Sequence, residues 1–173
     1  MNVLKQAIND NCHLLAELNN LLNQLMELNP ELYSSQNSVL STTSIGSHVR
    51  HIIEHYHIFL QALTTQSIVN YDRRSRDKLC EKCLLEASQQ IASVIHKLEK
   101  VSGEDQPLRV SIITNPSMRQ LIANSSVLRE IQFLQSHTVH HLALIGLVLK
   151  EEGLMLEGCM VKAPSTLQYE QES

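Results

Sequence analysis

Apolar residues recur at every third or fourth position through the first 29 residues, the spacing that places side chains on one face of an α-helix. Pro30 follows this stretch, and proline ends a helix because it lacks an amide hydrogen and its ring clashes with the preceding turn. We therefore predict a helix over residues 1–29. Its apolar stripe consists of Leu4, Ala7, Ile8, Leu14, Leu15, Leu18, Leu21, Leu22, Leu25 and Leu28.

The same spacing predicts three more helices. Their expected bounds are Ile45 to about Leu63, about Asp77 to Val101, and Ser125 or Ser126 to near Glu152. Thr43 or Ser44 is expected to cap the second of the four helices and Ser125 or Ser126 the fourth, since a hydroxyl at this place accepts a hydrogen bond from a free backbone amide. The polar segments 30–43 and 64–78 are predicted to be loops.

Residues 106–125 depart from the helical pattern. Two short runs of β-favouring residues flank Asn115-Pro116, which predicts a small hairpin that must pack on the helices to persist. The residues after about 153 are expected to form a loop or tail. Four long helices with modest connections favour an all-α, antiparallel four-helix bundle with this hairpin before the last helix, and 173 residues suit one domain, 1–173.

Composition narrows the classes of partner. Aromatic residues make up 3% of the chain, and the net charge is −4 with a pI near 6.1. These values argue against base-stacking surfaces and against attraction to a phosphate backbone. The chain has no apolar run of the length of about 18 residues that a membrane span needs, and it begins without the apolar core of a secretory signal. We expect a cytoplasmic protein that binds neither nucleic acid nor membranes.

The four cysteines of the chain are expected to be free thiols in a reducing compartment. Cys80 and Cys83 form a CxxC motif, but a zinc ribbon needs a second such pair, and Cys12 and Cys159 stand alone. A thioredoxin-like redox motif follows a strand, whereas this motif lies in a helical pattern. We therefore expect Cys80 and Cys83 to be structural or incidental.

Nine histidines against two phenylalanines is an unusual ratio, and most of the histidines fall on two predicted helices. They are His48, His51, His55 and His57 on the second helix, and His137, His140 and His141 on the fourth. Residues four apart share a helix face, so His137 and His141 form an HxxxH pair that can bind one metal ion. The residues between them include no Glu, which excludes the base of an HExxH metalloprotease.

A third ligand must come from the second helix, where His48, His51 and His55 lie close together beside the apolar stripe and His57 points away. Three neutral imidazoles suit Zn, Ni, Cu or Fe(II) and leave a coordination position open. Several imidazoles facing one apolar interior would be costly as ions and would repel one another if protonated, and metal binding would hold them neutral. The alternative is a set of core or surface histidines bonded to backbone and carboxylates without any metal.

The stretch Ser44-Ile45-Gly46-Ser47-His48-Val49-Arg50-His51-Ile52-Ile53-Glu54-His55 resembles the second helix of the DinB-like (YfiT-like) superfamily. Gln135-Ser136-His137-Thr138-Val139-His140-His141 resembles the HxxxH of its last helix, and the likeness covers essentially the whole chain. The resemblance implies a four-helix bundle, often a homodimer, that holds a divalent ion (Zn, Ni or Fe) through His51, His137 and His141. His48 is a second candidate for the place of His51. The segments 69–77 and 163–167 resemble a bacterial branch of the group for which no particular substrate is implied.

The resemblance also implies a range of chemistries on small molecules. Two are reactions: thiol transfer with bacillithiol or mycothiol, and mycothiol-dependent isomerisation. The third is the role of the metal-binding bundle within the iron-dependent sulfoxide synthase of ergothioneine biosynthesis, which needs a catalytic domain that this chain is too short to contain. In a thiol transferase the metal would hold a thiolate and lower its pKa. Arg73, Arg74 and Arg76 are candidates to bind the carboxylates of the thiol, or they form a solvated loop with neighbouring aspartates.

Two other functions fit the same histidines. A metal-dependent hydrolase would need a base near the metal, for which Glu54 is the nearest acidic residue in sequence, with Tyr56 and Tyr71 as proton partners. A non-catalytic metal-binding or stress-response bundle would instead have a closed shell of four ligands, with His48 or His55 as the fourth.

Overall fold

The structure is a computed structural model that describes residues 2–36, 43–73, 75–113, 115 and 120–155. It is mostly helical, with one small antiparallel sheet before the last helix, as the sequence predicts. The expected tail, with Cys159, and the candidate Arg74 lie outside the described residues. The elements are α1 (Val3–Leu28), the 3₁₀-helix η1 (Pro30–Tyr33), α2 (Ile45–Thr65), α3 (Lys78–Lys82), α4 (Leu84–Leu98), β1 (Pro107–Ile112), β2 (Leu121–Ser126) and α5 (Val127–Glu151).

Polar side chains cap the helices where the sequence places them. The Ser44 hydroxyl accepts a hydrogen bond from the Ser47 amide at the start of α2, and the Ser126 hydroxyl accepts one from the Arg129 amide at the start of α5. Each cap satisfies one of the backbone amides that the first helical turn leaves without a partner. Both α2 and α5, which carry the histidines, therefore begin within a residue of their predicted starts.

The single helix predicted from Asp77 to Val101 is wrong, because the chain forms two helices there. The Asp77 carboxylate caps the short α3, Cys83 is extended with φ −121° and ψ 110°, and α4 begins at the next residue. Two tertiary hydrogen bonds hold α3 in place. The Tyr33 hydroxyl donates to the Cys80 carbonyl at 2.7 Å, and the Asp77 amide donates to the Glu54 carboxylate at 3.0 Å.

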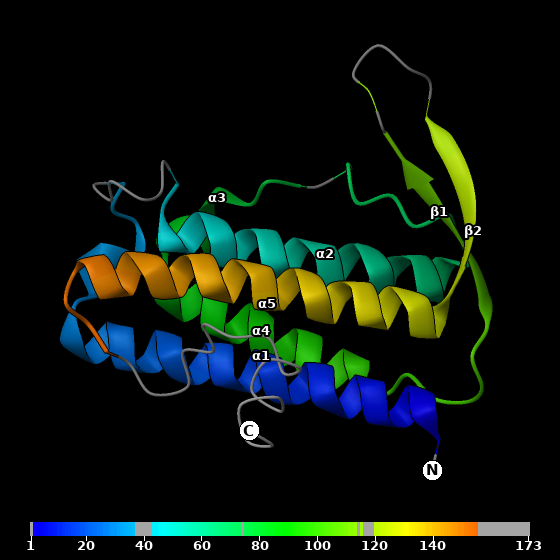
Figure 1. The fold of residues 1–173 in the computed structure, drawn as a ribbon, viewed down its shortest axis with the longest axis horizontal. Coiled ribbons are helices and arrows are strands. Elements are labelled where there is room, and N and C mark those ends of the chain that lie inside the picture. The colour runs from blue at the N-terminus through cyan, green and yellow to red at the C-terminus, as the bar shows by residue number, and fades with distance from the viewer. Residues whose placement is uncertain (1, 37–42, 74, 114, 116–119, 156–173) are drawn as a thin grey trace, which may run out of the picture.

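The long helices α1, α2, α4 and α5 lie side by side, with α1 and α2 each packed on both α4 and α5 (Figure 1). The antiparallel arrangement expected from sequence holds for α1 with α4 and for α2 with α5. Helices α2 and α4 instead run in the same direction, because the segment from 66 to 77 returns along α2 before α3 begins (Figure 1). Hydrogen bonds from Ser75 and Asp77 to Glu54, midway along α2, mark this return.

The apolar stripe of α1 forms the centre of the core. Its leucines from Leu15 to Leu25 are fully buried against the apolar faces of the other long helices. One polar group lies among them: Asn11 is fully buried and its amide donates to the carbonyl oxygens of Ala7 and Ile131. The Tyr56 hydroxyl donates to the Asn11 side chain at 2.7 Å and lies 3.1 Å from the Thr138 hydroxyl. This network joins α1, α2 and α5. Tyr56 and Thr138 directly follow His55 and His137 in the sequence, so the network fixes the backbone at both histidines.

Replacing Asn11 by alanine is expected to lower the free energy of unfolding by about 2 kcal/mol, because the buried Ile131 carbonyl and Tyr56 hydroxyl would each lose a partner. Urea unfolding followed by circular dichroism measures this change. The matched control is Asn20→Ala on the same helix, where the side chain is exposed and the expected change is within about 0.5 kcal/mol. Equal unfolding midpoints for the two variants would contradict the structural role of the network.

The two antiparallel strands of the predicted hairpin are confirmed, whereas Pro116 of the expected turn lies outside the described residues. Its strands pair in a register that runs from Pro107 opposite Ser126 to Ile112 opposite Leu121. Val69 adds a parallel bridge to Val110, and these two residues pack with Ala62 of α2. The sheet therefore persists by packing on a helix, as its small size requires.

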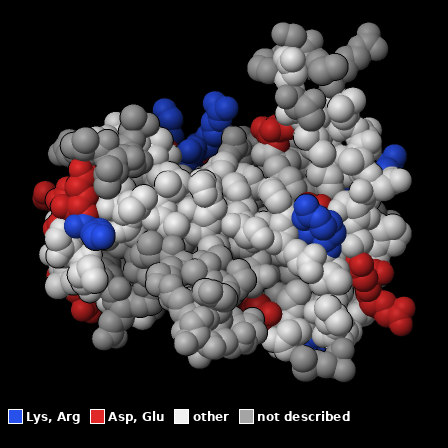
Figure 2. Space-filling view, viewed as in Figure 1, with Lys and Arg blue, Asp and Glu red and all other residues white. Residues whose placement is uncertain are grey.

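The surface carries both acidic and basic side chains, as the composition predicts. On the face shown in Figure 2, acidic and basic residues lie apart in small groups, and the described residues form no broad basic area there. Within the described part of the chain, no helix has both the length and the apolar character needed to cross a membrane.

Candidate metal centre

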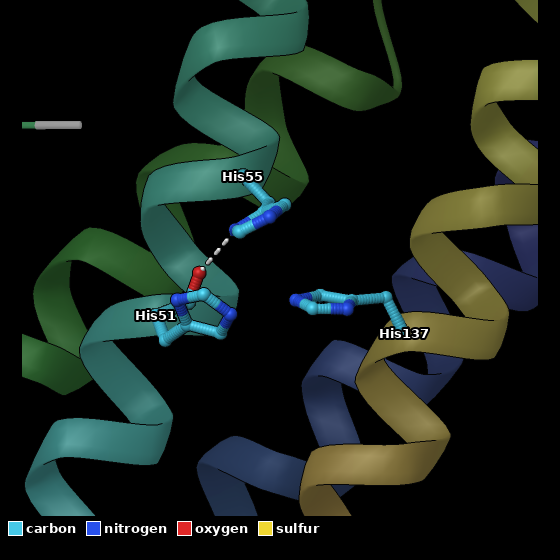
Figure 3. A group of neighbouring side chains, drawn as sticks. All are labelled: His51, His55 and His137. Atoms are coloured by element: carbon cyan, nitrogen blue, oxygen red, sulfur yellow. Dashed lines mark hydrogen bonds between the residues drawn. The ribbon is translucent and has the colours of Figure 1, made fainter. Parts of the chain in front are cut away.

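Two groups of histidines face each other across the contact between α2 and α5. Because the helices are antiparallel, the start of one group lies beside the end of the other. His48 lies next to His141, and His55 lies next to His137. Figure 3 shows His51 and His55 on α2 and His137 reaching toward them from α5. His57 is on another side of α2, where it lines a surface cavity with Lys97 and Lys100 of the α4 end, as its helical position predicts.

The three histidines predicted as ligands lie together. The ring centroids are 4.9 Å apart for His51 and His137, 4.6 Å for His51 and His141, and 4.6 Å for His137 and His141. Helical spacing alone brings His137 and His141 onto one face, whereas the approach of His51 depends on how α2 packs on α5.

A second set of three shares two of these residues. The nearest candidate ligand atoms of His51, His55 and His137 all lie within 4.8 Å of one another, and the ring of His55 is 4.2 Å from that of His137. Ligand atoms on a tetrahedral zinc ion lie about 3.4 Å apart, since each Zn–N bond is about 2.05 Å. Modest rotations of the rings would therefore bring this set to ligand distances.

A backbone hydrogen bond orients His55. Its Nδ1 lies 2.8 Å from the carbonyl oxygen of His51, one helical turn earlier (Figure 3). A carbonyl only accepts, so Nδ1 carries the proton and the lone pair is on Nε2. Metal-binding histidines commonly have their second nitrogen held in this way. Sequence reasoning placed His55 beside the site but not among its three ligands.

His48 pairs with His141 instead of joining the other rings. Their Nδ1 atoms are 3.0 Å apart, and His48 Nε2 lies 3.0 Å from the Thr43 hydroxyl. One of the two Nδ1 atoms donates and the other accepts, which both neutral rings can do. The structure thus places His48, the second candidate for the position of His51, at the His141 end of the cluster.

The surroundings favour neutral imidazoles. Burial, followed by the nearby rings of His137 and His48, lowers the pKa of His141 to about 3. Burial and then His140 also lower the pKa of His48. Neutral rings keep the lone pairs that a metal needs, so binding would not have to displace a proton from them at neutral pH.

Two aromatic rings cover the His55–His137 end of the cluster. Tyr71 stacks on His55 with centroids 5.1 Å apart, and Phe133 stacks on His137 at 5.6 Å. The two aromatic rings are themselves 5.1 Å apart. Sequence reasoning did not include Phe133, although its position four residues before His137 puts it on the same helix face.

Hydrogen bonds fix this aromatic cover. The Tyr71 hydroxyl donates to Glu130 at 2.8 Å, and the Ser125 hydroxyl donates to the other oxygen of the same carboxylate at 2.6 Å. Burial and then the Glu130 charge raise the pKa of Tyr71, so its proton stays in place at neutral pH. Tyr71 is therefore a fixed hydrogen-bond donor and Glu130 its acceptor.

Other candidates from the sequence are engaged elsewhere. Glu54 accepts the Asp77 amide and the Ser75 hydroxyl, and Tyr56 belongs to the buried network with Asn11. Arg73 lines a different cavity beside Ile58, and Arg76 has a positive φ of 54° in the segment before α3.

The first cysteine of the CxxC motif, Cys80, is buried, and the second, Cys83, is half-buried. Burial and then neighbouring carboxylates raise the pKa of Cys80 to about 12, so it is a protonated thiol at neutral pH and unsuited to nucleophilic or metal chemistry. The structural role expected for Cys80 agrees with this environment.

Comparisons with known proteins add little about function. No family model matches the chain, and no solved structure is significantly similar to it. A protein of Rhizopus delemar named FK506-binding protein 5 is 32% identical over 109 residues, which are 61% of this chain and 28% of that protein. The chain thus spans a minor part of this relative, and the match does not assign it to a family.

Proposed function

We propose that this protein is a four-helix bundle of the DinB-like type that binds one divalent metal ion through histidines of α2 and α5 and uses it in a reaction on a small substrate. The observation that carries the proposal is the meeting of two pairs spaced four residues apart, His51 with His55 and His137 with His141, across one helix contact. Imidazole nitrogens suit Zn, Ni and Fe(II), whereas Mg and Ca prefer oxygen ligands.

His51 and His137 belong to both candidate sets, so we propose them as ligands in either case. His141 is the third ligand implied by the resemblance in sequence, and its burial with a low pKa supports it. His55 competes for this place because its Nδ1 is already bonded to a carbonyl and its Nε2 can face a metal. Three ligands would leave a position for substrate, whereas all four would close the shell.

The proposed activity is thiol transfer, in which the sulfur of a low-molecular-weight thiol bonds to an electrophilic carbon and a leaving group departs with its electron pair. A bound divalent ion would supply a lowered pKa for the thiol. The thiol would be that of a co-substrate, and the buried Cys80 of this chain stays protonated. Tyr71 and Phe133 would keep water from one side of the centre.

The hydrolase alternative has weaker support. It requires a base beside the metal, and the Glu54 carboxylate already accepts hydrogen bonds from the segment before α3. Glu130 is also occupied by two hydroxyl donors. A non-catalytic metal-binding role remains the alternative that a closed four-histidine shell would favour.

Metal content measured by mass spectrometry on untagged protein tests the proposal. We expect near-stoichiometric metal in the wild type after incubation with Zn, Ni or Fe(II), and loss of it in His137→Ala, since removal of one of three ligands costs orders of magnitude in affinity. His141→Ala and His55→Ala decide the third ligand. The variant that loses metal marks a ligand, and loss in both would indicate the closed shell.

His96→Ala is the matched control, because His96 is exposed on α4 and outside the cluster. It is expected to bind as much metal as the wild type. Equal metal content in His137→Ala and His96→Ala would overturn the metal centre. If metal binds, conjugation of bacillithiol or mycothiol to 1-chloro-2,4-dinitrobenzene tests thiol transfer, and a rate unchanged by His137→Ala would refute it.

A further inference from the structure

A cavity of about 390 Å³ lies between the hairpin, the segment at 71–72 and the start of α5. Most of its wall is apolar, and its charged side chains are Arg129 and Glu130 at the start of α5 and Asp72 on the facing segment. This size falls in the range of about 300–1,000 Å³ that is typical of small-molecule sites. The residues that carry the argument are Tyr71, Val110, Ile112, Ala123, Arg129 and Phe133.

The cavity shares a wall with the histidine cluster. Tyr71 and Phe133 line it, and the same two rings stack on His55 and His137. One aromatic ring therefore separates an occupant of the cavity from each of these histidines. Tyr71 is held by its hydrogen bond to Glu130, so the wall is fixed where the two sites meet.

Of the described residues that line the cavity, Arg129 carries the positive charge, on an exposed side chain, and Asp72 and Glu130 carry negative charges. Among the described residues, the guanidinium of Arg129 forms no ion pair or hydrogen bond. The two carboxylates nearby are engaged, since Asp72 accepts the Ile113 amide and Glu130 accepts the Tyr71 and Ser125 hydroxyls. Arg129 lines the same cavity as Tyr71 and Phe133, so its charge can reach an occupant of the cavity.

We infer that this cavity binds a small molecule with an apolar body and one anionic group, which Arg129 receives, and that its occupant contacts the outer side of the Tyr71–Phe133 wall. The apolar body suits the lining of Val110, Ile112 and the two rings, and a planar guanidinium suits a carboxylate or sulfonate. The link to the metal rests on the proposed function, whereas the cavity itself does not.

Two fluorescent probes test the inference on the metal-free chain of 173 residues. 1-Anilinonaphthalene-8-sulfonate has an apolar body and an anionic group, and N-phenyl-1-naphthylamine is the same body without the charge. We expect saturable binding of one sulfonate probe per chain, tighter than the neutral probe by about tenfold. Arg129→Gln is expected to remove this difference, since a charge-assisted hydrogen bond to Arg129 would be lost.

A pair of phenylalanine variants locates the probe. Ala123→Phe fills the cavity and is expected to weaken binding of the sulfonate probe by at least about tenfold. Asn124→Phe adds a ring on the same strand at an exposed position on the opposite face of the sheet, outside the cavity lining, and it is expected to bind like the wild type. Equal binding by the two variants, or no effect of Arg129→Gln, would overturn the inference, because the probe would then be on the exposed aliphatic surface of the hairpin.

Cobalt separates failure of the cavity from failure of the metal centre. In Co²⁺-loaded protein, the sulfonate probe is expected to shift the visible absorption of the ion in the wild type and in Asn124→Phe but not in Ala123→Phe. Probe binding to the cavity in a protein that takes up no cobalt would refute the proposed function and leave the cavity in place. Cobalt binding with no probe-dependent shift would refute the contact across the aromatic wall.

Discussion

Replacing Gly46 by alanine is expected to destabilise the fold by about 3 kcal/mol, although alanine is the better helix former. Gly46 is in the first turn of α2, where α2 contacts the backbone of α3. A Cβ atom at this position would overlap the carbonyl oxygen of Glu81 and lie 2.9 Å from the Tyr33 ring. Both neighbours are fixed, since one is backbone and the other donates a hydrogen bond to Cys80.

Urea unfolding of Gly46→Ala distinguishes this steric effect from helix propensity. On propensity alone the substitution would stabilise the protein by about 1 kcal/mol. Ser47→Ala is the matched control at the next, half-buried position, with an expected change near zero beyond the small gain in propensity. A higher unfolding midpoint for Gly46→Ala than for the wild type would show that α3 does not approach α2 as closely as the structure has it.

The long helices and the hairpin could be predicted because local spacing and capping specify them. Ser44 and Ser126 are caps in the sequence and in the structure, and the apolar stripe of α1 is the buried face. The break at Cys83 could not be predicted, because it depends on contacts across the chain. The Glu54 carboxylate and the Tyr33 hydroxyl hold α3 against α2, and neither contact leaves a local pattern.

In the candidate site, too, local spacing predicts some features and tertiary contacts decide the others. Spacing of four residues predicts that His137 and His141 share a face, and that His51 and His55 do. It does not predict which rings of one helix meet which rings of the other, since this depends on the direction and offset of α2 on α5. Hence sequence reasoning selected His51, His137 and His141, whereas the closest candidate ligand atoms are those of His51, His55 and His137. The aromatic cover needs the return segment to bring Tyr71 beside Phe133.

Saturation with Zn²⁺ is expected to raise the free energy of unfolding by about 4 kcal/mol when free zinc is about a thousand times its dissociation constant. For a chain of this size, that gain corresponds to a rise of about 10 °C in the melting temperature. The physical reason is that an ion held by His51 and His137 crosslinks α2 and α5 in the folded state only, since the unfolded chain does not bring these residues together. Differential scanning calorimetry with and without zinc measures the shift.

The variants show whether the shift comes from this cluster. His137→Ala is expected to lose nearly the whole zinc-dependent rise, whereas His96→Ala, at an exposed position on α4, keeps it. Mg²⁺ at the same concentration is expected to have no effect, because it prefers oxygen ligands in octahedral geometry. A rise that persists in His137→Ala would mean that zinc binds elsewhere on the chain. Without a rise in the wild type, the metal-free packing of the imidazoles would be sufficient by itself, with the His48–His141 hydrogen bond and the stacking on Tyr71 and Phe133 holding the two helices together.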